Sequence, residues 1–108
     1  MLYVVLDLET TGFSRSNCHI IELAAEILAP NGVAMEDSVF SSLIKPPQPI
    51  PSIVVELTGI TQEMVETQHT FKEVIETFFD FLLERVQTYE ETSPQQMEHI
   101  VFVGHNSK

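Results

Sequence analysis

The stretch MLYVVLDLETTG, residues 1–12, decides the fold of this chain. Side chains alternate across a β-strand, so the even-numbered residues 2–8 share one face, while Asp7 and Glu9 share the other. Both faces are apolar before Asp7, which is typical of an interior strand in a sheet covered on both faces. The pattern therefore predicts a strand over residues 2–8, with two carboxylates emerging together at its carboxyl end.

These two carboxylates are candidate metal ligands. In an extended strand, the Cβ atoms of Asp7 and Glu9 are about 7 Å apart. Like charges at this spacing repel unless a cation neutralises them, and hard oxygen ligands suit Mg²⁺ or Mn²⁺. Thr10, Thr11 and Gly12 then predict a tight exit from the strand, whose hydroxyls and amides can hydrogen-bond a molecule bound over the metal.

Composition limits the kind of partner that the chain can bind. Sixteen acidic and five basic residues give a net charge of −11, which argues against a broad basic surface for nucleic acid. A metal-centred nuclease remains compatible, because bound cations supply the positive charge. The single cysteine, Cys18, excludes an internal disulfide and favours an intracellular location, cytoplasmic or nuclear. No window approaches the roughly 18 apolar residues of a membrane span, so we expect no membrane partner.

The middle of the chain predicts further strands and short helices. Residues 19–28 and 34–44 indicate a hairpin around the turn at 30–32. Residues 45–51 contain four of the six prolines and indicate a rigid connector, in preference to a ligand for a polyproline-binding module. Short helices are expected over 53–57 and 62–66.

Helix caps and apolar spacing define the rest. Ser52 is expected to open the first short helix, and Thr61 to cap the second. Apolar residues spaced by three and four predict a helix over 71–87, with Thr70 and Glu73 in the form of a capping box. An exposed acidic loop over 88–98 and a short strand over 100–104 complete the pattern.

Three stretches resemble one family. The hexapeptide Asp7–Gly12, DLETTG, resembles the first motif of the 3′–5′ exonucleases of the proofreading-subunit type, the DnaQ-like superfamily with four acidic residues. Leu57–Thr61, LTGIT, resembles the family segment that packs against the terminal nucleotide. Val103–Asn106, VGHN, resembles the start of the second exonuclease motif. The three stretches occur in family order with family-like spacing.

The resemblance implies an α/β fold, a ribonuclease-H-like mixed β-sheet with flanking helices. Strands 2–8, 19–28 and 34–44 should form an antiparallel meander, and strand 100–104 should lie parallel to the first and beside it. That arrangement would place Asp7 next to Gly104 and His105.

The implied activity is hydrolysis of phosphodiester bonds from the 3′ end of single-stranded DNA or RNA by two Mg²⁺ or Mn²⁺ ions. Asp7 would bridge both ions, and Glu9 would hold the ion that activates water. Leu57, Thr58, His105 and Asn106 would contact the substrate. The LTGIT match favours the histidine subclass, but the position of His105 in its motif is not that of the general base.

The resemblance also implies that the set of catalytic residues is incomplete. The third metal-binding aspartate of the family falls two residues beyond Lys108. We therefore expect residues 1–108 to form a single, incomplete exonuclease domain, truncated at its C-terminal side and inactive by itself. A polymerase, or other domains of the same chain, stays open as a partner.

The main alternative is a non-catalytic interaction domain of the same ribonuclease-H-like fold. The acidic loop over 88–98 would then be its contact surface. The missing C-terminal third favours this alternative. The intact Asp7 and Glu9 weigh against it, because a domain released from catalysis has no physical reason to keep adjacent carboxylates at a strand end.

Overall fold

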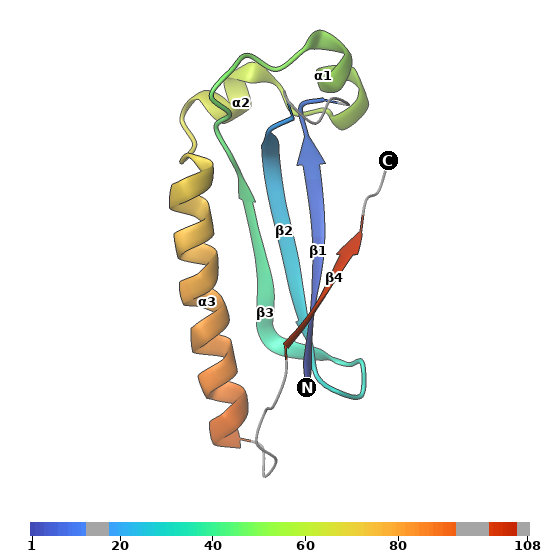
Figure 1. Ribbon diagram of the computed structural model, residues 1–108, viewed down its shortest axis with the longest axis vertical. Coiled ribbons are helices and arrows are strands. Elements are labelled where there is room, and N and C mark those ends of the chain that lie inside the picture. Colours follow the sequence, from blue (N-terminus) through green and yellow to red (C-terminus); the bar gives the residue numbers. More distant parts are fainter. Residues whose placement is uncertain (13–17, 93–99, 106–108) are drawn as a thin grey trace.

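The computed structural model describes residues 1–12, 18–92 and 100–105, and in them a four-stranded sheet is flanked by helices (Figure 1). The strands lie in the order β3-β2-β1-β4. The elements are β1 (Leu2–Thr10), β2 (Ile20–Leu28), β3 (Ala34–Leu43), α1 (Ser52–Thr58), α2 (Gln62–Glu66), α3 (Phe71–Thr92) and β4 (Ile100–His105).

The predicted sheet topology is confirmed. β1 pairs antiparallel with β2, and β2 pairs antiparallel with β3, which is the expected meander. β4 pairs parallel with β1, from Leu2 opposite Ile100 to Asp7 opposite His105. The mixed sheet therefore places the first and the last strand of the described chain side by side.

The main core lies between the sheet and α3. Val74, Phe78 and Leu82 of α3 are buried against apolar side chains of one sheet face, among them Leu2 and Val4 of β1. Side chains at i, i+4 and i+8 lie on one side of a helix, so this spacing is the reason that α3 packs along the sheet. A second core joins α1 and α2 to Ile21 at the start of β2.

The capping box of α3 is confirmed, but the helix is longer than predicted. The backbone N–H of Thr70 donates to Oε1 of Glu73 at 2.9 Å, and the backbone N–H of Glu73 donates to Oγ1 of Thr70 at 3.4 Å. The prediction of a loop from residue 88 is wrong for 88–92, which are helical. Tyr89 explains the extension, because its side chain packs against the main core.

Two smaller expectations are corrected. β1 continues through Glu9 and Thr10, because both residues pair with β2. Ser52 does not cap α1: it is the first helical residue, and the N-cap is Pro51, whose carbonyl accepts hydrogen bonds from the helix. Gly59 ends α1 with φ = 76°, a left-handed conformation that glycine adopts at little cost.

The expected cover on both faces of the sheet is not found among the described residues. The face opposite α3 carries Val39 and Val103, whose side chains are 65% and 42% exposed. Asp7 is on this same face. None of the described helices is long and apolar enough to cross a membrane.

Candidate active site

Asp7 and Glu9 lie on the sheet face opposite α3, near the carboxyl end of β1. The backbone of Asp7 is flanked by Ala24 of β2 on one side and by His105 of β4 on the other. Both acidic side chains are half-buried. Oδ1 of Asp7 is buried and has no hydrogen-bond partner among the described residues. A buried carboxylate oxygen without a partner is costly in a folded protein, so a cation would stabilise this site.

A third carboxylate, that of Glu22, lies beside this pair. Glu22 is the partner of Glu9 across the antiparallel β1–β2 ladder, and side chains of directly opposite residues share one face. Burial raises the pKa of Glu22, and the negative charges of Glu9 and Asp7 raise it further. The sequence interpretation missed Glu22. Only the register of β1 and β2 shows it, because Glu22 is thirteen positions from Glu9 along the printed chain.

The raised pKa of Glu22 predicts a pH-dependent stability. The folded state holds the Glu22 proton more tightly than the unfolded chain does, so ionisation of Glu22 destabilises the fold as pH rises above the ordinary value of 4.5. In metal-free buffer, Glu22→Gln should therefore melt at a higher temperature than the wild type at pH 8. The difference should disappear below pH 4, where both the folded and unfolded chains carry a protonated Glu22. Thermal melts monitored by circular dichroism at a series of pH values would check this.

Glu26→Gln is the matched control for that measurement. Glu26 lies on the same strand and the same face, but it is exposed and is opposite Val5 rather than a carboxylate. Its substitution should change the melting temperature less. A Glu22→Gln variant that gains no stability at pH 8 would contradict the repulsion between Glu22 and the Asp7–Glu9 pair.

Thr11 bonds the end of β1 to the start of β2. The backbone N–H of Thr11 donates to the carbonyl of His19 at 2.8 Å, and Oγ1 of Thr11 accepts the backbone N–H of His19 at 3.0 Å. Thr11 is buried, so it ties the turn to the start of β2. Thr10 and Gly12 are half-buried. Their predicted contacts with substrate stay predictions.

Leu57 and Thr58 lie at the end of α1, which sits beyond the carboxyl end of β1 (Figure 1). The side chain of Leu57 is 57% exposed, whereas Oγ1 of Thr58 donates to the carbonyl of Val54 at 2.8 Å and accepts the backbone N–H of Ile60 at 3.1 Å. Leu57 is therefore available for contact, and Thr58 shapes the end of the helix. α1 and the carboxylates of β1 belong to the same end of the sheet.

The second motif is only partly described. The backbone of His105 is the parallel partner of Asp7, as predicted. Asn106 lies outside the described residues. Within those residues, no three side chains of His, Cys, Asp or Glu gather closely enough to hold a metal ion. The assignment of Asp7 and Glu9 as metal ligands stays a prediction.

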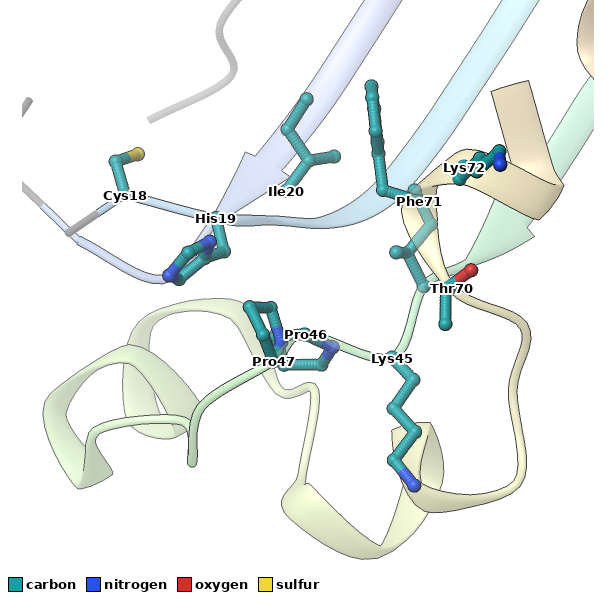
Figure 2. A pocket seen from close by; sticks show the side chains of 10 residues that line it. Cys18, His19, Ile20, Lys45, Pro46, Pro47, Thr70, Phe71 and Lys72 are labelled. Carbon is teal, nitrogen blue, oxygen red and sulfur yellow. The ribbon is translucent and has the colours of Figure 1, made fainter. Parts of the chain in front are cut away.

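A cavity of about 630 Å³ lies near this end of the sheet, and neither Asp7 nor Glu9 lines it (Figure 2). Its walls come from the start of β2, the proline-rich connector and the start of α3: Cys18, His19, Ile20, Ile44, Lys45, Pro46, Pro47, Thr70, Phe71 and Lys72. In Figure 2 the ammonium groups of Lys45 and Lys72 point away from its middle. The sequence predicts the prolines as a connector, and the structure shows that they also wall this cavity.

The model of the exonuclease family RNase_T matches residues 4–94. The chain belongs to the exonuclease family. The resemblance seen in the motifs of the sequence is thereby confirmed.

Curated relatives of this chain include DNA polymerase III proteins and a 3′–5′ exonuclease. It is 46% identical over 80 residues to the PolC-type DNA polymerase III of Clostridium perfringens, and 40% identical over 80 residues to the epsilon subunit of DNA polymerase III of Aquifex aeolicus. It is 41% identical over 81 residues to the 3′–5′ exonuclease DinG of Bacillus subtilis. Each match covers 74% of this chain, but only 5%, 38% and 8% of the respective relative.

Solved exonuclease structures share the fold. The cell-death related nuclease 4 has a TM-score of 0.75 at 27% identity, over 95% of this chain and 34% of its own. The nuclease domain of 3′hExo, a DEDDh family member bound to rAMP, has a TM-score of 0.72 at 22% identity, over 95% of this chain and 50% of its own. The fold of the exonuclease chain is therefore ribonuclease-H-like, as predicted.

Proposed function

We propose that this protein is a metal-dependent 3′–5′ exonuclease, which hydrolyses phosphodiester bonds at the 3′ end of single-stranded DNA or RNA. The observation that carries the proposal is the position of Asp7. It lies at the carboxyl end of an interior strand, beside the backbone of His105 in the second motif, with one buried oxygen that has no hydrogen-bond partner among the described residues. The relative named 3′–5′ exonuclease DinG supports the direction of hydrolysis.

Asp7 and Glu9 would hold the Mg²⁺ or Mn²⁺ of this reaction, two ions in the complete site. Exonucleases of this type use divalent metal ions, and carboxylate oxygens are the ligands that such ions prefer. When bound, the ions lower the pKa of water and stabilise the charge that develops on the phosphate. The role of this chain's residues is to hold the two carboxylates rigidly on one strand, at the end of the sheet where α1 lies.

The substrate contacts are assigned to residues around that pair. Thr10, Thr11 and Gly12 would contact the terminal nucleotide, and the exposed Leu57 would pack against its base. Thr58, His105 and Asn106 complete the proposed set. Thr58 and Thr11 act largely by shaping the backbone, because their hydroxyls already bond within the chain.

The 108 residues are proposed to be one part of a single exonuclease domain and to be inactive by themselves. The match of the family over residues 4–94 supports the assignment to one domain. Two direct ligands leave most positions of two octahedral ions to solvent. The group that would deprotonate water is not among the residues assigned to the site. The histidine subclass is favoured, which the likeness to a DEDDh fold supports.

The test uses the full-length protein and a single-stranded oligonucleotide labelled at its 5′ end. In Mg²⁺ or Mn²⁺, we expect a ladder of products that shorten from the 3′ end, and no products in excess chelator. DNA and RNA oligonucleotides of the same sequence are compared, because the site does not distinguish them. Internal cuts, or degradation that persists in chelator, would overturn the proposal.

The alternative is an interaction domain of the same fold. A full-length protein that is inert on both oligonucleotides, yet folded and able to bind a polymerase, would favour it. Because two relatives are named as DNA polymerase III proteins, a polymerase or another domain of the same chain is the partner to test. An intracellular location is proposed as well.

A further inference from the structure

Glu22 lies beside Asp7 and Glu9, but it is not one of the two proposed metal ligands. In the antiparallel ladder, Glu22 is directly opposite Glu9. Ala24, two residues further along β2, is opposite Asp7. Opposite Cβ atoms are about 5 Å apart, and diagonal neighbours about 7–8 Å apart. The three carboxylates therefore share one face within a small area, although Glu22 comes from a different strand.

This arrangement is unfavourable for the protein without a cation. Like charges directly opposite each other destabilise a sheet. Among the lysines, arginines and histidines whose side chains the structure describes, none forms an ion pair with Asp7 or Glu22. A divalent cation between the strands would attract all three carboxylates, and this attraction would offset their mutual repulsion.

Glu22 is nevertheless not placed as a third direct ligand. The described residues contain no group of three side chains able to hold an ion together, so Glu22 does not converge with Asp7 and Glu9 on one point. Divalent ions such as Mg²⁺ keep several water molecules when few protein ligands are present. Residues that hydrogen-bond to such water commonly change metal affinity by 10–100-fold when they are substituted.

We propose that Glu22 is a positioning residue for the cation held by Asp7 and Glu9, acting on it through intervening water rather than by direct coordination. The proposal rests on the proposed function, because that function supplies the cation. Under this proposal, β2 contributes to metal affinity through Glu22, in addition to Asp7 and Glu9 on β1.

The test is calorimetric titration of the full-length protein with Mn²⁺. Glu22→Gln keeps the shape of the side chain and removes its charge, and it should weaken Mn²⁺ binding by about tenfold. Asp7→Asn should remove the heat of binding altogether. Glu26→Gln is the matched control: it removes an equal charge from the same face of β2 and, like Glu22, is a diagonal neighbour of Asp7, but it is opposite Val5 rather than Glu9. It should change the affinity by less than about twofold.

A second measurement separates positioning from a merely structural role. Without metal, Glu22→Gln should be at least as stable as the wild type, yet Mn²⁺ should raise its melting temperature less. Glu22→Asp, which keeps the charge, should restore part of that rise. Wild-type affinity in Glu22→Gln, with binding still lost in Asp7→Asn, would overturn this inference and leave the proposed function standing. A wild-type protein that binds no Mn²⁺ would instead overturn the metal site of the proposed function.

Discussion

Replacing Asp7 with alanine in the full-length protein is expected to lower the rate of 3′–5′ degradation by about a thousandfold or more, with the fold intact. Metal ions supply several kcal/mol of transition-state stabilisation, and each 1.36 kcal/mol corresponds to a tenfold change in rate. The fold should survive because the variant removes one of three crowded carboxylates, and its buried Oδ1 has no hydrogen-bond partner among the described residues. Single-turnover degradation of the labelled oligonucleotide and a thermal melt would measure the two effects.

Glu26→Ala is the control for this experiment. It removes a carboxylate from the same face of the sheet, but from an exposed position opposite Val5, and it should keep nearly the full rate. Degradation that continues in Asp7→Ala would refute both the role of Asp7 and the mechanism built on it. Loss of the rate together with a collapsed melt would show instead that Asp7 stabilises the fold.

Replacing Phe78 with alanine is expected to destabilise the protein by about 3–5 kcal/mol. Phe78 is 3% exposed in the core between α3 and the sheet, and its ring centroid is 5.3 Å from that of Phe40 on β3. Truncation leaves a cavity and removes this aromatic contact. A typical domain is stable by about 5–15 kcal/mol, so a large share of the stability should be lost. Urea unfolding monitored by circular dichroism gives the difference.

The adjacent Phe79 supplies the comparison for Phe78. Its side chain is 50% exposed on the outer side of the same helix. Phe79→Ala should cost less than about 1 kcal/mol, because exposed positions contribute little burial. Equal losses in the two variants would show that α3 does not pack on the sheet through the face described.

The topology was predictable because local signals agreed with one another. The apolar strand over 2–8, the turn at 30–32 and the capping box at Thr70 and Glu73 each fix one element, and the structure confirms all three. The end of α3 was not predictable from polarity. Residues 88–92 are rich in acidic and polar residues, yet they are helical and Tyr89 packs against the core.

The candidate site was predictable only where its residues are close in the chain. Asp7 and Glu9 are two residues apart on one strand, so their shared face follows from strand geometry alone. Glu22 comes next to them through the register of β1 with β2, which includes an irregularity between Glu9 and Thr10. The cavity at Phe71 combines three distant segments. No local pattern carries that information.

The parallel pairing of β1 with β4 has a consequence for how the site is assembled. The chain between Thr10 and Ile100 is about nine times as long as the chain between Thr10 and Ile20, and the entropy of closing such an unstructured loop is greater by about 2 kcal/mol. Docking of α3 shortens the loop and lowers this cost. The hairpins of β1, β2 and β3 need no such help. On a ribosome, Asp7 and Glu9 would thus emerge first, and β4, which completes their edge of the sheet, would follow only after the hairpins and α3 had been synthesised.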